Sequence, residues 1–516
     1  MSAVYPMPPV WPTVVHMLAD AALQDPDGPA LVCGGEALCY RQYAACVSGL
    51  AWQLQRDGLG EGDRVVVFMA NSLDVAIALF AVQAAGAQVV PLNPAYTVSE
   101  LNQVLQNANA RGIIYDEAVQ GVVDGLEAKF DRYYCVGNGV GTHGPAQRLT
   151  RWRDQLTLAD ALPLPRTEMP SILQYTGGTT GVPKGVSLRH SAVSTNVSQR
   201  EALVPTHAGK ERVLAITPLF HSYAMAMGLY LAAYARSALV IVTRYRPDTV
   251  LDAIAREHIT LLLGSPTIFS GLMGYEGFAK ADLSSLRLSS SGSSALSEET
   301  LRRWEASTGC VVCEGYGQTE AGPVLTYNPL NGQRKIGSVG VVTPETEVEI
   351  VDVQDGEKVL PVGEIGEIRA RGPQVMSGYF GMPGETAQTL RDGWLYTGDI
   401  GRLDEEGYLF ICDRKKEMVI VGGFNVYPRE IEEVLYRHPA VSEVAVIGVP
   451  DSYRGEILQA YVVVADEKVG ASDLQDFLMQ RLVKYKWPAH IHMVNDLPRT
   501  SVGKIDKKRL RAMAAA

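Results

Sequence analysis

The chain has 516 residues, of which 47% are hydrophobic and 20% are charged. At roughly 150 residues per domain, this length predicts about three or four domain-sized units, and the composition excludes intrinsic disorder for all but the ends. The 46 basic and 57 acidic residues give a formal charge of -11 without a long basic block. This balance disfavours a general nucleic-acid binder.

The seven cysteines are odd in number and lie mostly within apolar runs, so we expect reduced, buried thiols. Cys310 and Cys313 form a CxxC pair, but no second pair or Cys/His cluster stands near them in the sequence. A zinc site is therefore disfavoured, and we expect this pair in a core strand. Prolines interrupt the amino-terminal segment, and no stretch has roughly 18 uninterrupted apolar residues. We expect a soluble, cytoplasmic protein without a transmembrane segment.

Short apolar, β-branched runs alternate with longer helix-like segments in the first part of the chain. This alternation is typical of βαβ units on a largely parallel sheet. Two such units are predicted, with strand, helix and strand at 64–69, 73–86 and 87–92 and again at 238–245, 249–258 and 259–264. We interpret the serine cluster from Ser289 to Ser294 as a low-complexity linker.

After Gly337 the sequence changes character. Gly and Pro turns recur among short strands as far as Phe410, which indicates a small β-rich subdomain. From about Lys416, strand and helix alternate again, over a length sufficient for a separate α+β domain. We predict an α/β protein whose large N-terminal domain, residues 1–415, contains stacked βαβ-type sheets and the β-rich subdomain at about 337–410. Residues 416–516 would form a small C-terminal domain.

The segment from Tyr175 to Gly185 holds four glycines, three threonines and one lysine in eleven residues. Such a loop can turn its amides toward an anion, while the threonine hydroxyls and the lysine ammonium add donors. It predicts a polyphosphate-binding loop, with a glycine-rich hairpin turn as the structural alternative. A Walker loop needs Gly directly before the Lys and Ser or Thr directly after it. Pro183 and Gly185 flank Lys184 instead, so that motif is excluded.

This segment closely resembles the signature of the adenylate-forming superfamily, which includes acyl-CoA synthetases, firefly luciferase and the adenylation domains of peptide synthetases. Further segments agree with that family in order and spacing, so the resemblance covers almost the whole chain. These segments are PLNPAY (91–96), PLFHSYAM (218–225), LRLSSSGSSAL (286–296), EGYGQTEAG (314–322), GWLYTGD (393–399), DRKKEMVIVGGFNVYPREIE (413–432) and PRTSVGK (498–504).

The resemblance implies an AMP-forming acid–thiol ligase, an acyl-CoA synthetase. A carboxylate is a poor electrophile, and its attack on the α-phosphorus of ATP would give an acyl-adenylate and pyrophosphate before the acyl group passes to CoA. The catalyst must align two anions and neutralise the charge that develops between them. The implied cofactors are ATP, Mg²⁺ and CoA, and the implied substrate is a small carboxylic acid. Members of this family are often monomers or homodimers.

The resemblance also implies catalytic residues. Lys504, on a mobile C-terminal domain, would bridge the substrate carboxylate and the α-phosphate during adenylation. Glu320 would position Mg²⁺ beside the phosphates, with Thr319 on the α-phosphate. Thr176 and Lys184 would act on the β- and γ-phosphates. The alternatives without a catalytic role are that Glu320 is a surface ion-pair partner and that Lys504 is a solvated lysine of the charged tail.

The nucleotide-binding residues are implied in the same way. Asp399 would accept hydrogen bonds from both ribose hydroxyls with help from Arg414, and Tyr316 would stack on adenine. Without this context, Asp399 is a turn former and Tyr316 a core aromatic. The full implied set is Thr176, Gly177, Gly178, Thr179, Thr180, Gly181, Lys184, Tyr316, Gly317, Thr319, Asp399 and Arg414.

A second group of residues is implied for the transfer to CoA. Lys416 falls where the family places its hinge, so rotation of the C-terminal domain would withdraw Lys504. The same rotation would bring Gly422 and Gly423 up to line a channel for the pantetheine arm, with Asn425 beside them. The sequence departs from the family at two positions here. Several relatives carry Lys where this chain has Ile420, and plant hydroxycinnamate ligases carry Gln where this chain has Asn425.

The acyl pocket is the last site that the resemblance implies. His221 corresponds to a residue at the pocket entrance that is often called a gate; the alternative is a satisfied core histidine. The small residues of the pocket imply space for a chain, and Met227 would form a flexible apolar wall. The residues implied to line the pocket are His221, Tyr223, Met227, Ser291, Gly292, Ser293, Gly315, Gly317, Gly322 and Val324.

An apolar pocket without an arginine in YGQTE favours a medium- or long-chain fatty acid. AGPVL (321–325) also resembles hydroxycinnamate ligases such as 4-coumarate–CoA ligases, so an aryl or phenylpropenoic acid is the close alternative. Transfer to the phosphopantetheine of a carrier protein, release of the adenylate and a luciferase-type oxygenation use the same scaffold. A non-catalytic nucleotide-binding scaffold is the alternative from another class.

Overall fold

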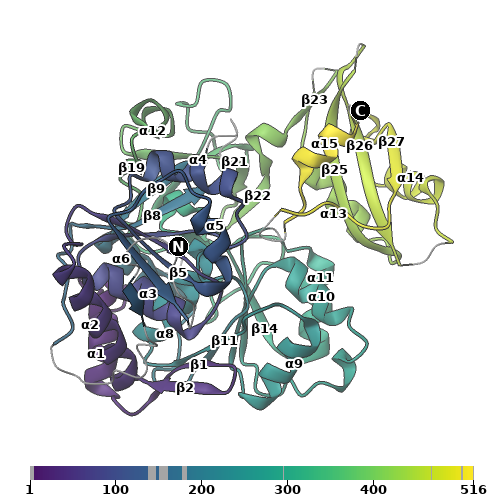
Figure 1. Cartoon of the computed structure of the whole chain (residues 1–516). Helices are drawn as coiled ribbons and strands as arrows, with labels where there is room; N and C mark the ends of the chain where they lie inside the picture. Colours follow the sequence, from purple (N-terminus) through teal and green to yellow (C-terminus); the bar gives the residue numbers. More distant parts are fainter. Residues whose placement is uncertain are drawn as a thin grey trace.

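The computed structural model describes residues 5–137, 147–149, 161–176, 183–294, 296–422, 424–451, 453–465, 468–500 and 504–514. Within these ranges a large α/β domain is followed by a small α+β domain at the carboxyl end of the chain (Figure 1). The α/β fold class predicted from the sequence is confirmed.

The first large sheet contains one of the two predicted βαβ units, since β3 pairs in parallel with β4. The described strands follow the order β19-β9-β8-β4-β3-β5-β6-β7. Their bounds are β3 (Arg64–Phe68), β4 (Gln88–Pro91), β5 (Gly112–Asp116), β6 (Arg132–Val136), β7 (Gln147–Leu149), β8 (Pro170–Thr176), β9 (Lys184–Arg189) and β19 (Gly378–Tyr379).

The second large sheet contains the other predicted unit, and its described strands follow the order β16-β15-β14-β13-β12-β10-β11-β1-β2. Leu239 of β11 belongs to the core on one face of this sheet and Val240 to the core on the other face, which explains the continuous apolar run. The strands are β1 (Pro29–Cys33), β2 (Glu36–Cys39), β10 (Arg212–Ala215), β11 (Ala238–Ile241), β12 (Leu261–Gly264), β13 (Leu288–Ser291), β14 (Val311–Gly317), β15 (Val324–Tyr327) and β16 (Val341–Val342).

One group of helices shares a hydrophobic core with residues from both large sheets. α3 is buried along its whole length, as its almost uniformly apolar sequence requires. The group comprises α1 (Val14–Gln24), α2 (Tyr40–Arg56), α3 (Leu73–Ala84), α6 (His190–Leu203), α7 (Ser222–Ala224), the π-helix η3 (Met225–Tyr230) and α8 (Leu231–Tyr234).

Other helices cover the outer faces of the two sheets (Figure 1). α4 (Val98–Ala108), η1 (Glu117–Val119) and α5 (Gln120–Asp124) lie on the first sheet, and α9 (Pro247–Arg256), α10 (Pro266–Met273), η4 (Phe278–Lys280) and α11 (Glu298–Thr308) lie on the second. Layers of helices and sheets therefore alternate through the large domain.

The serine cluster is not a linker, contrary to our interpretation of the sequence. Ser289, Ser290 and Ser291 lie in β13, inside the second sheet, and none is more than 1% exposed. Two of the hydroxyls have partners that make burial tolerable: Trp304 Nε1 donates to Ser289 Oγ at 3.0 Å, and Ser290 Oγ lies 2.9 Å from Tyr327 Oη. A run of serines can therefore form a central strand when its hydroxyls are hydrogen-bonded.

The region after Gly337 folds into a β-rich layer, with β17, β18, β21 and β20 in that order and β22 on β21. Its elements are β17 (Glu347–Val351), β18 (Gly366–Arg371), α12 (Pro383–Thr389), β20 (Leu390–Arg391), β21 (Trp394–Leu403) and β22 (Leu409–Arg414). One strand within this stretch, β19, leaves the layer and pairs with β9 of the first large sheet. That pairing connects the β-rich region to the segment after the phosphate loop.

The small domain has a sheet of its own, with β24-β23-β26-β25 in order and β27 on β26. α13 and α14 pack on one face and α15 on the other. The elements are η6 (Lys415–Glu417), β23 (Val419–Val421), β24 (Phe424–Val426), α13 (Pro428–Tyr436), β25 (Val441–Asp451), β26 (Gly455–Val464), α14 (Ala471–Met479), η7 (Lys484–Lys486), β27 (His490–Met493) and α15 (Lys507–Ala514).

No helix in the described ranges combines the length and the hydropathy needed to cross a lipid bilayer. The thiols of Cys310 and Cys313 are both buried, beside and within β14, as expected for a core position.

Candidate active site

The predicted nucleotide residues Tyr316, Asp399 and Arg414 come together, with Tyr316 and Arg414 at the ends of β14 and β22 and Asp399 in the middle of β21. The antiparallel register of β21 and β22 places Asp399 opposite Arg414, and Arg414 Nε lies 3.6 Å from Asp399 Oδ1. The Tyr316 hydroxyl donates to Asp399 Oδ2 at 2.7 Å. Burial raises the pKa of the Asp399 carboxyl, while Arg414 and the Tyr316 hydrogen bond lower it. The result is a buried carboxylate fixed by two neighbours.

Lys504 reaches this cluster from the small domain. Its backbone closes a short hairpin, in which Thr500 N donates to Lys504 O at 2.7 Å and Lys504 N donates to Thr500 Oγ1 at 3.2 Å. Burial and the Arg414 charge, opposed by Asp399, together lower the pKa of the Lys504 ammonium to about 8. Because the Lys504 charge also acts on His221 and Asp399, the ammonium lies among residues of the large domain.

The phosphate loop is described only at its two ends. Thr176, the last residue of β8, pairs with Lys184, the first residue of β9. The Lys184 ammonium forms an ion pair with Glu385 of α12 and lies 5.1 Å from the ring centroid of Tyr379. The predicted residues Gly177, Gly178, Thr179, Thr180 and Gly181 lie outside the described residues.

Glu320 lies beside this lysine in η5 (Thr319–Ala321). Its side chain accepts a 2.8 Å hydrogen bond from the Tyr379 hydroxyl. Burial raises the pKa of the Glu320 carboxyl, and both the Tyr379 hydrogen bond and the Lys184 charge lower it. The hydroxyl of Thr319 lies 3.1 Å from that of Ser222, at the start of α7. A buried carboxylate near a phosphate-loop lysine is an oxygen ligand of the kind that Mg²⁺ takes together with substrate phosphates.

His221 precedes α7 and is not a satisfied core histidine. Its Nδ1 is buried and has no hydrogen-bond partner in the part of the chain that the structure describes. Burial and the Lys504 charge together lower the pKa of the imidazole to about 4, so His221 is neutral near pH 7. A neutral ring with an unused buried nitrogen stands next to the cation that the small domain supplies.

The predicted acyl-pocket glycines do not open empty space. A Cβ on Gly292 would lie 3.1 Å from the ring of Tyr223, and a Cβ on Gly315 would lie 2.7 Å from the ring of Tyr327. We expected room for a chain there, but two tyrosine rings stand against these positions. Small residues at Gly292 and Gly315 make space for aromatic side chains of the protein itself.

The other predicted pocket residues differ in burial and in backbone conformation. Met227 is fully buried in η3, and Ser291 ends β13 with its hydroxyl buried. Ser293 follows with a φ of 70°, in the left-handed region that glycine adopts without strain. Gly317 lies so close to Pro323 that a Cβ would stand 1.9 Å from the Pro323 carbonyl oxygen, so only glycine fits there.

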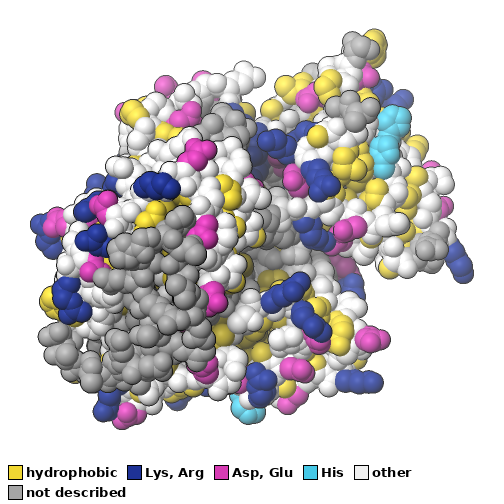
Figure 2. Space-filling view, in the orientation of Figure 1, with side chains coloured by type: hydrophobic (Ala, Val, Ile, Leu, Met, Phe, Trp, Pro, Cys, Tyr) yellow, Lys and Arg dark blue, Asp and Glu magenta, His cyan; other side chains and the backbone are white. Residues whose placement is uncertain are grey.

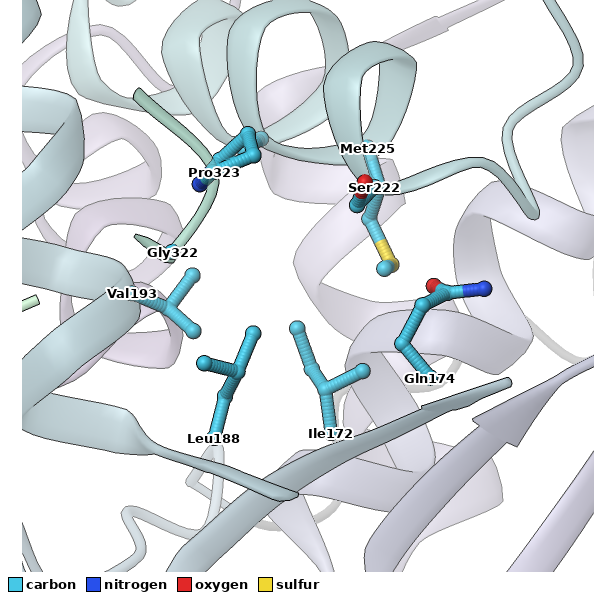
Figure 3. A pocket seen from close by; sticks show the side chains of 9 residues that line it. Ile172, Gln174, Leu188, Val193, Ser222, Met225, Gly322 and Pro323 are labelled. Carbon is cyan, nitrogen blue, oxygen red and sulfur yellow. The ribbon is translucent and has the colours of Figure 1, made fainter. Parts of the chain in front are cut away.

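A small apolar cavity lies between α6, α7 and the strands β8 and β9, where side chains from these elements point toward one another (Figure 3). Of the predicted pocket residues, Gly322 lines it, and Val324 follows closely in the sequence. The cavity volume is about 10 Å³, too small for an acyl chain without movement. The lining residues are Ile172, Gln174, Leu188, Val193, Ser222, Met225, Ala226, Gly322 and Pro323.

The residues predicted for CoA transfer are not part of this cluster. Gly422 and Asn425 are exposed on the hairpin of β23 and β24, where Gly422 N donates to Arg454 O at 2.9 Å. Gly423 lies outside the described residues. Lys416 is in η6, directly after β22, and burial lowers the pKa of its ammonium. In this arrangement Lys504, and not the hairpin, faces the nucleotide residues.

Charge on the molecular surface is unevenly distributed, although the net charge is negative. Figure 2 shows Lys and Arg side chains gathered along the boundary between the large and small domains. Arg414, Lys416 and Lys504 belong to this boundary. Concentrated positive charge in a cleft attracts anionic substrates such as ATP and CoA.

Several residues of the site were missed by our reading of the sequence. Tyr379 and Glu385 hold Glu320 and Lys184, yet they lie outside every motif that we quoted. Ser222 lies inside PLFHSYAM but was given no role, and Tyr327 lies beyond EGYGQTEAG; both contact predicted residues. The sequence did not indicate roles for these four residues, because the residues that they contact are distant in the chain.

Two stacked sheets and a second domain that carries a lysine to a carboxylate–tyrosine–arginine cluster define an adenylate-forming enzyme. Residues 18–380 match the family described as AMP-binding enzyme, and residues 430–504 match the AMP-binding enzyme C-terminal domain. The chain belongs to this family, as predicted.

Known relatives agree with this assignment. A long-chain-fatty-acid–CoA ligase of Bacillus subtilis is 37% identical over 529 residues, covering 96% of this chain and 94% of that protein. A feruloyl-CoA synthase of an Amycolatopsis species is 36% identical over 493 residues, covering 95% and 96%. The crystal structure of ATP-bound MatB from Rhodopseudomonas palustris is 31% identical, with a TM-score of 0.87 and coverage of 97% and 98%.

These matches confirm the predicted enzyme class, an AMP-forming acid–CoA ligase with ATP, Mg²⁺ and CoA as its cofactors. The relatives are named for different acids, so they do not fix the substrate of this chain.

Proposed function

We propose that this chain joins a medium- or long-chain fatty acid to CoA through an acyl-adenylate, and that Lys504 is the cation of the first step. The observation that carries the proposal is the position of Lys504. A half-buried lysine from the small domain lies close enough to Asp399 and Arg414 of the large domain for their charges to act on it, and its own charge acts on His221. A positive charge there can align two anions that would otherwise repel each other.

In the proposed first step, Asp399 accepts hydrogen bonds from the ribose hydroxyls while Arg414 and Tyr316 hold the carboxylate in place. Tyr316 also provides the ring on which adenine stacks. Lys504 then contacts both the acid and the α-phosphate, and Thr319 donates to the α-phosphate. Attack by the acid oxygen breaks the bond between the α-phosphorus and the bridging oxygen, and pyrophosphate leaves with the electron pair.

Glu320 is proposed to hold Mg²⁺ together with the substrate phosphates, and the metal supplies charge neutralisation there. The Tyr379 hydroxyl fixes the orientation of the Glu320 carboxylate. Thr176 and Lys184 contact the β- and γ-phosphates. Because Lys184 is paired with Glu385 in this structure, ATP must compete with that carboxylate for the ammonium.

For the second step we propose that residues 416–516 rotate as a unit about Lys416, relative to residues 1–415. This movement takes Lys504 away and brings Gly422, Gly423 and Asn425 to the acyl-adenylate, where the CoA thiol attacks the acyl carbon and AMP leaves. The position of Lys416 directly after β22, between the two sheets, supports this boundary. We also propose a cytoplasmic location, where thiols stay reduced; the seven cysteines, all within the described ranges, are thiols and not disulfides.

An end-point assay tests the proposed function. Purified protein with ATP, Mg²⁺, CoA and a panel of straight-chain acids is expected to form acyl-CoA, detected by mass spectrometry, with one AMP per thioester. Replacing CoA with a phosphopantetheinylated carrier protein should abolish product formation. Thioester formation only on the carrier, or ADP in place of AMP, would refute the proposal.

An aryl or phenylpropenoic acid is the second candidate substrate. The observation that favours it is the packing of the Tyr223 and Tyr327 rings against Gly292 and Gly315. The acyl side of the site, where the predicted pocket residues lie, is therefore lined by aromatic groups. Including cinnamic acids in the same panel compares the two candidates directly.

A further inference from the structure

Arg200 of α6 is a fully buried arginine whose hydrogen-bonding capacity is only partly used. Its side chain has 0% exposure, and Nη1 donates to Glu201 Oε1 at 2.5 Å and also to Val204 O. Its Nε and Nη2 are buried and have no hydrogen-bond partner among the residues that the structure describes. Buried guanidinium donors without acceptors are costly and rare, so this pair of nitrogens calls for an acceptor.

The position of Arg200 on α6 puts it beside the acyl side of the site. On the same helix, Val193 lines the cavity of Figure 3, and Asn196 Nδ2 donates to Val324 O at 2.8 Å. Residues spaced by three or four positions share a helix face, so Arg200 continues this face one turn further. Burial raises the pKa of both the Cys313 thiol and the Tyr223 hydroxyl, and the Arg200 charge opposes that rise, which places Arg200 near both.

Three buried hydroxyls form a cluster, and one of them, on Tyr223, lies near Arg200. The Tyr223 hydroxyl donates to Ser290 Oγ at 3.1 Å, and Ser290 Oγ lies 2.9 Å from Tyr327 Oη. The two tyrosine oxygens are 3.4 Å apart. Their rings are those that stand against Gly292 and Gly315, so the inner wall of the acyl side is polar at this point. A plain hydrocarbon chain has no polar atom that could form a hydrogen bond with this wall.

We infer that Arg200, with Tyr223, Ser290 and Tyr327, forms a specificity-determining polar end to the acyl pocket, which takes an acid carrying a neutral acceptor oxygen at the end remote from its carboxylate. The inference rests on the proposed function and narrows its substrate class. The acceptor is neutral because Glu201 already balances the charge of Arg200, and a second carboxylate would stand near that glutamate. A phenolic oxygen of an aryl acid and a terminal hydroxyl of a fatty acid share this chemistry.

Matched pairs of acids test the inference in the wild-type enzyme. Pyrophosphate release is measured as kcat/KM for para-hydroxycinnamic against cinnamic acid, and for omega-hydroxydodecanoic against dodecanoic acid. The oxygenated member of at least one pair is expected to be preferred by about tenfold or more, because a buried donor gains its acceptor. The pair that shows the preference identifies the source of the oxygen.

Two results overturn the inference while leaving the proposed function in place. One is equal kcat/KM within both pairs, and the other is a preference for dodecanedioic acid over both dodecanoic and omega-hydroxydodecanoic acid. Absence of pyrophosphate release with every acid would instead refute the proposed function, and the inference with it.

Variants locate the preference at this cluster. Arg200→Met should bring the ratio within the preferred pair to about one, and Tyr327→Phe and Ser290→Ala should each lower it severalfold. Because Arg200→Met removes the buried ion pair with Glu201 and so destabilises the fold, the two hydroxyl deletions provide an independent test. Tyr115→Phe is the matched control, since its buried hydroxyl donates to Gln120 at 3.0 Å in the other large sheet. An unchanged ratio in all three cluster variants would overturn the assignment.

Discussion

The nucleotide side and the acyl side of the site are built in different ways. On the nucleotide side, backbone register places Asp399 opposite Arg414, and polar side chains surround a position that a second domain completes with Lys504. On the acyl side, the protein fills the space with its own tyrosine rings. The difference teaches that activation by ATP depends on residues fixed by strand pairing and one delivered cation, whereas acid selection depends on how the interior packs.

The largest expected effect comes from removing the delivered cation. Lys504→Ala should lower acid-dependent adenylation by about 10²- to 10³-fold, the size of effect seen when one donor to a developing charge is lost. The rate is measured as pyrophosphate release. The same variant should still convert supplied acyl-adenylate and CoA to thioester within a few-fold of the wild-type rate.

Lys508→Ala is the matched control for that variant, because Lys508 lies in the same charged tail, at the start of α15, without a contact to the cluster in the described residues. It should leave both steps unchanged. Equal loss of the two steps in Lys504→Ala would contradict the idea that the lysine serves only adenylation.

The next largest effect is on ATP binding and concerns Asp399, which strand pairing holds in place. Asp399→Asn should raise the dissociation constant for ATP by about 10- to 100-fold, because hydrogen bonds to a charged group are worth about 1.5–3 kcal/mol. Equilibrium titration with ATP measures it. Asp404→Asn is the control, since Asp404 pairs with Lys335 at 2.6 Å outside the site. Matching ATP affinity in the two variants would remove Asp399 from the binding site.

A smaller effect is expected from overfilling the acyl side. Gly315→Ala places a Cβ 2.7 Å from the Tyr327 ring, and overpacking of this kind costs about 1–3 kcal/mol. Denaturant unfolding should show that loss, and the preference among acids should shift while ATP affinity stays constant. A fully stable variant with unchanged acid preference would show that the ring moves freely.

The smallest effect is a pH dependence. Burial lowers the pKa of Lys504 to about 8, so its cation is lost at a lower pH than in a free lysine, and kcat/KM for ATP should fall about tenfold between about pH 7 and 9. His221, with its pKa lowered to about 4, stays neutral throughout. In Lys504→Arg, whose guanidinium does not titrate there, this decline should vanish. A decline that persists in the variant would assign it to another group.

The motifs of the chain allowed much of this arrangement to be predicted from the sequence. Tyr316, Asp399 and Arg414 each belong to a motif that resembles the family, and the structure brings them together. The two βαβ units were visible because apolar runs of strand and helix length alternate. The residue roles themselves stay predictions until the variants are measured.

Other features depend on contacts that no local pattern reveals. Lys184 and Glu385 are 201 positions apart in the chain, and their pairing follows from β19 reaching the first large sheet. The strand of serines has no apolar periodicity, and its burial depends on Trp304 and Tyr327. The rings against Gly292 and Gly315 could not be foreseen, because a glycine in a sequence does not show what occupies the space beside it.

The central claim is that the chain activates its acid as a mixed anhydride with AMP. The most direct measurement is exchange of labelled pyrophosphate into ATP without CoA, with and without an acid that the enzyme turns over. We predict rapid exchange that requires both the acid and Mg²⁺ and is lost in Lys504→Ala. Thioester formation by the wild-type protein without any such exchange would contradict the claim.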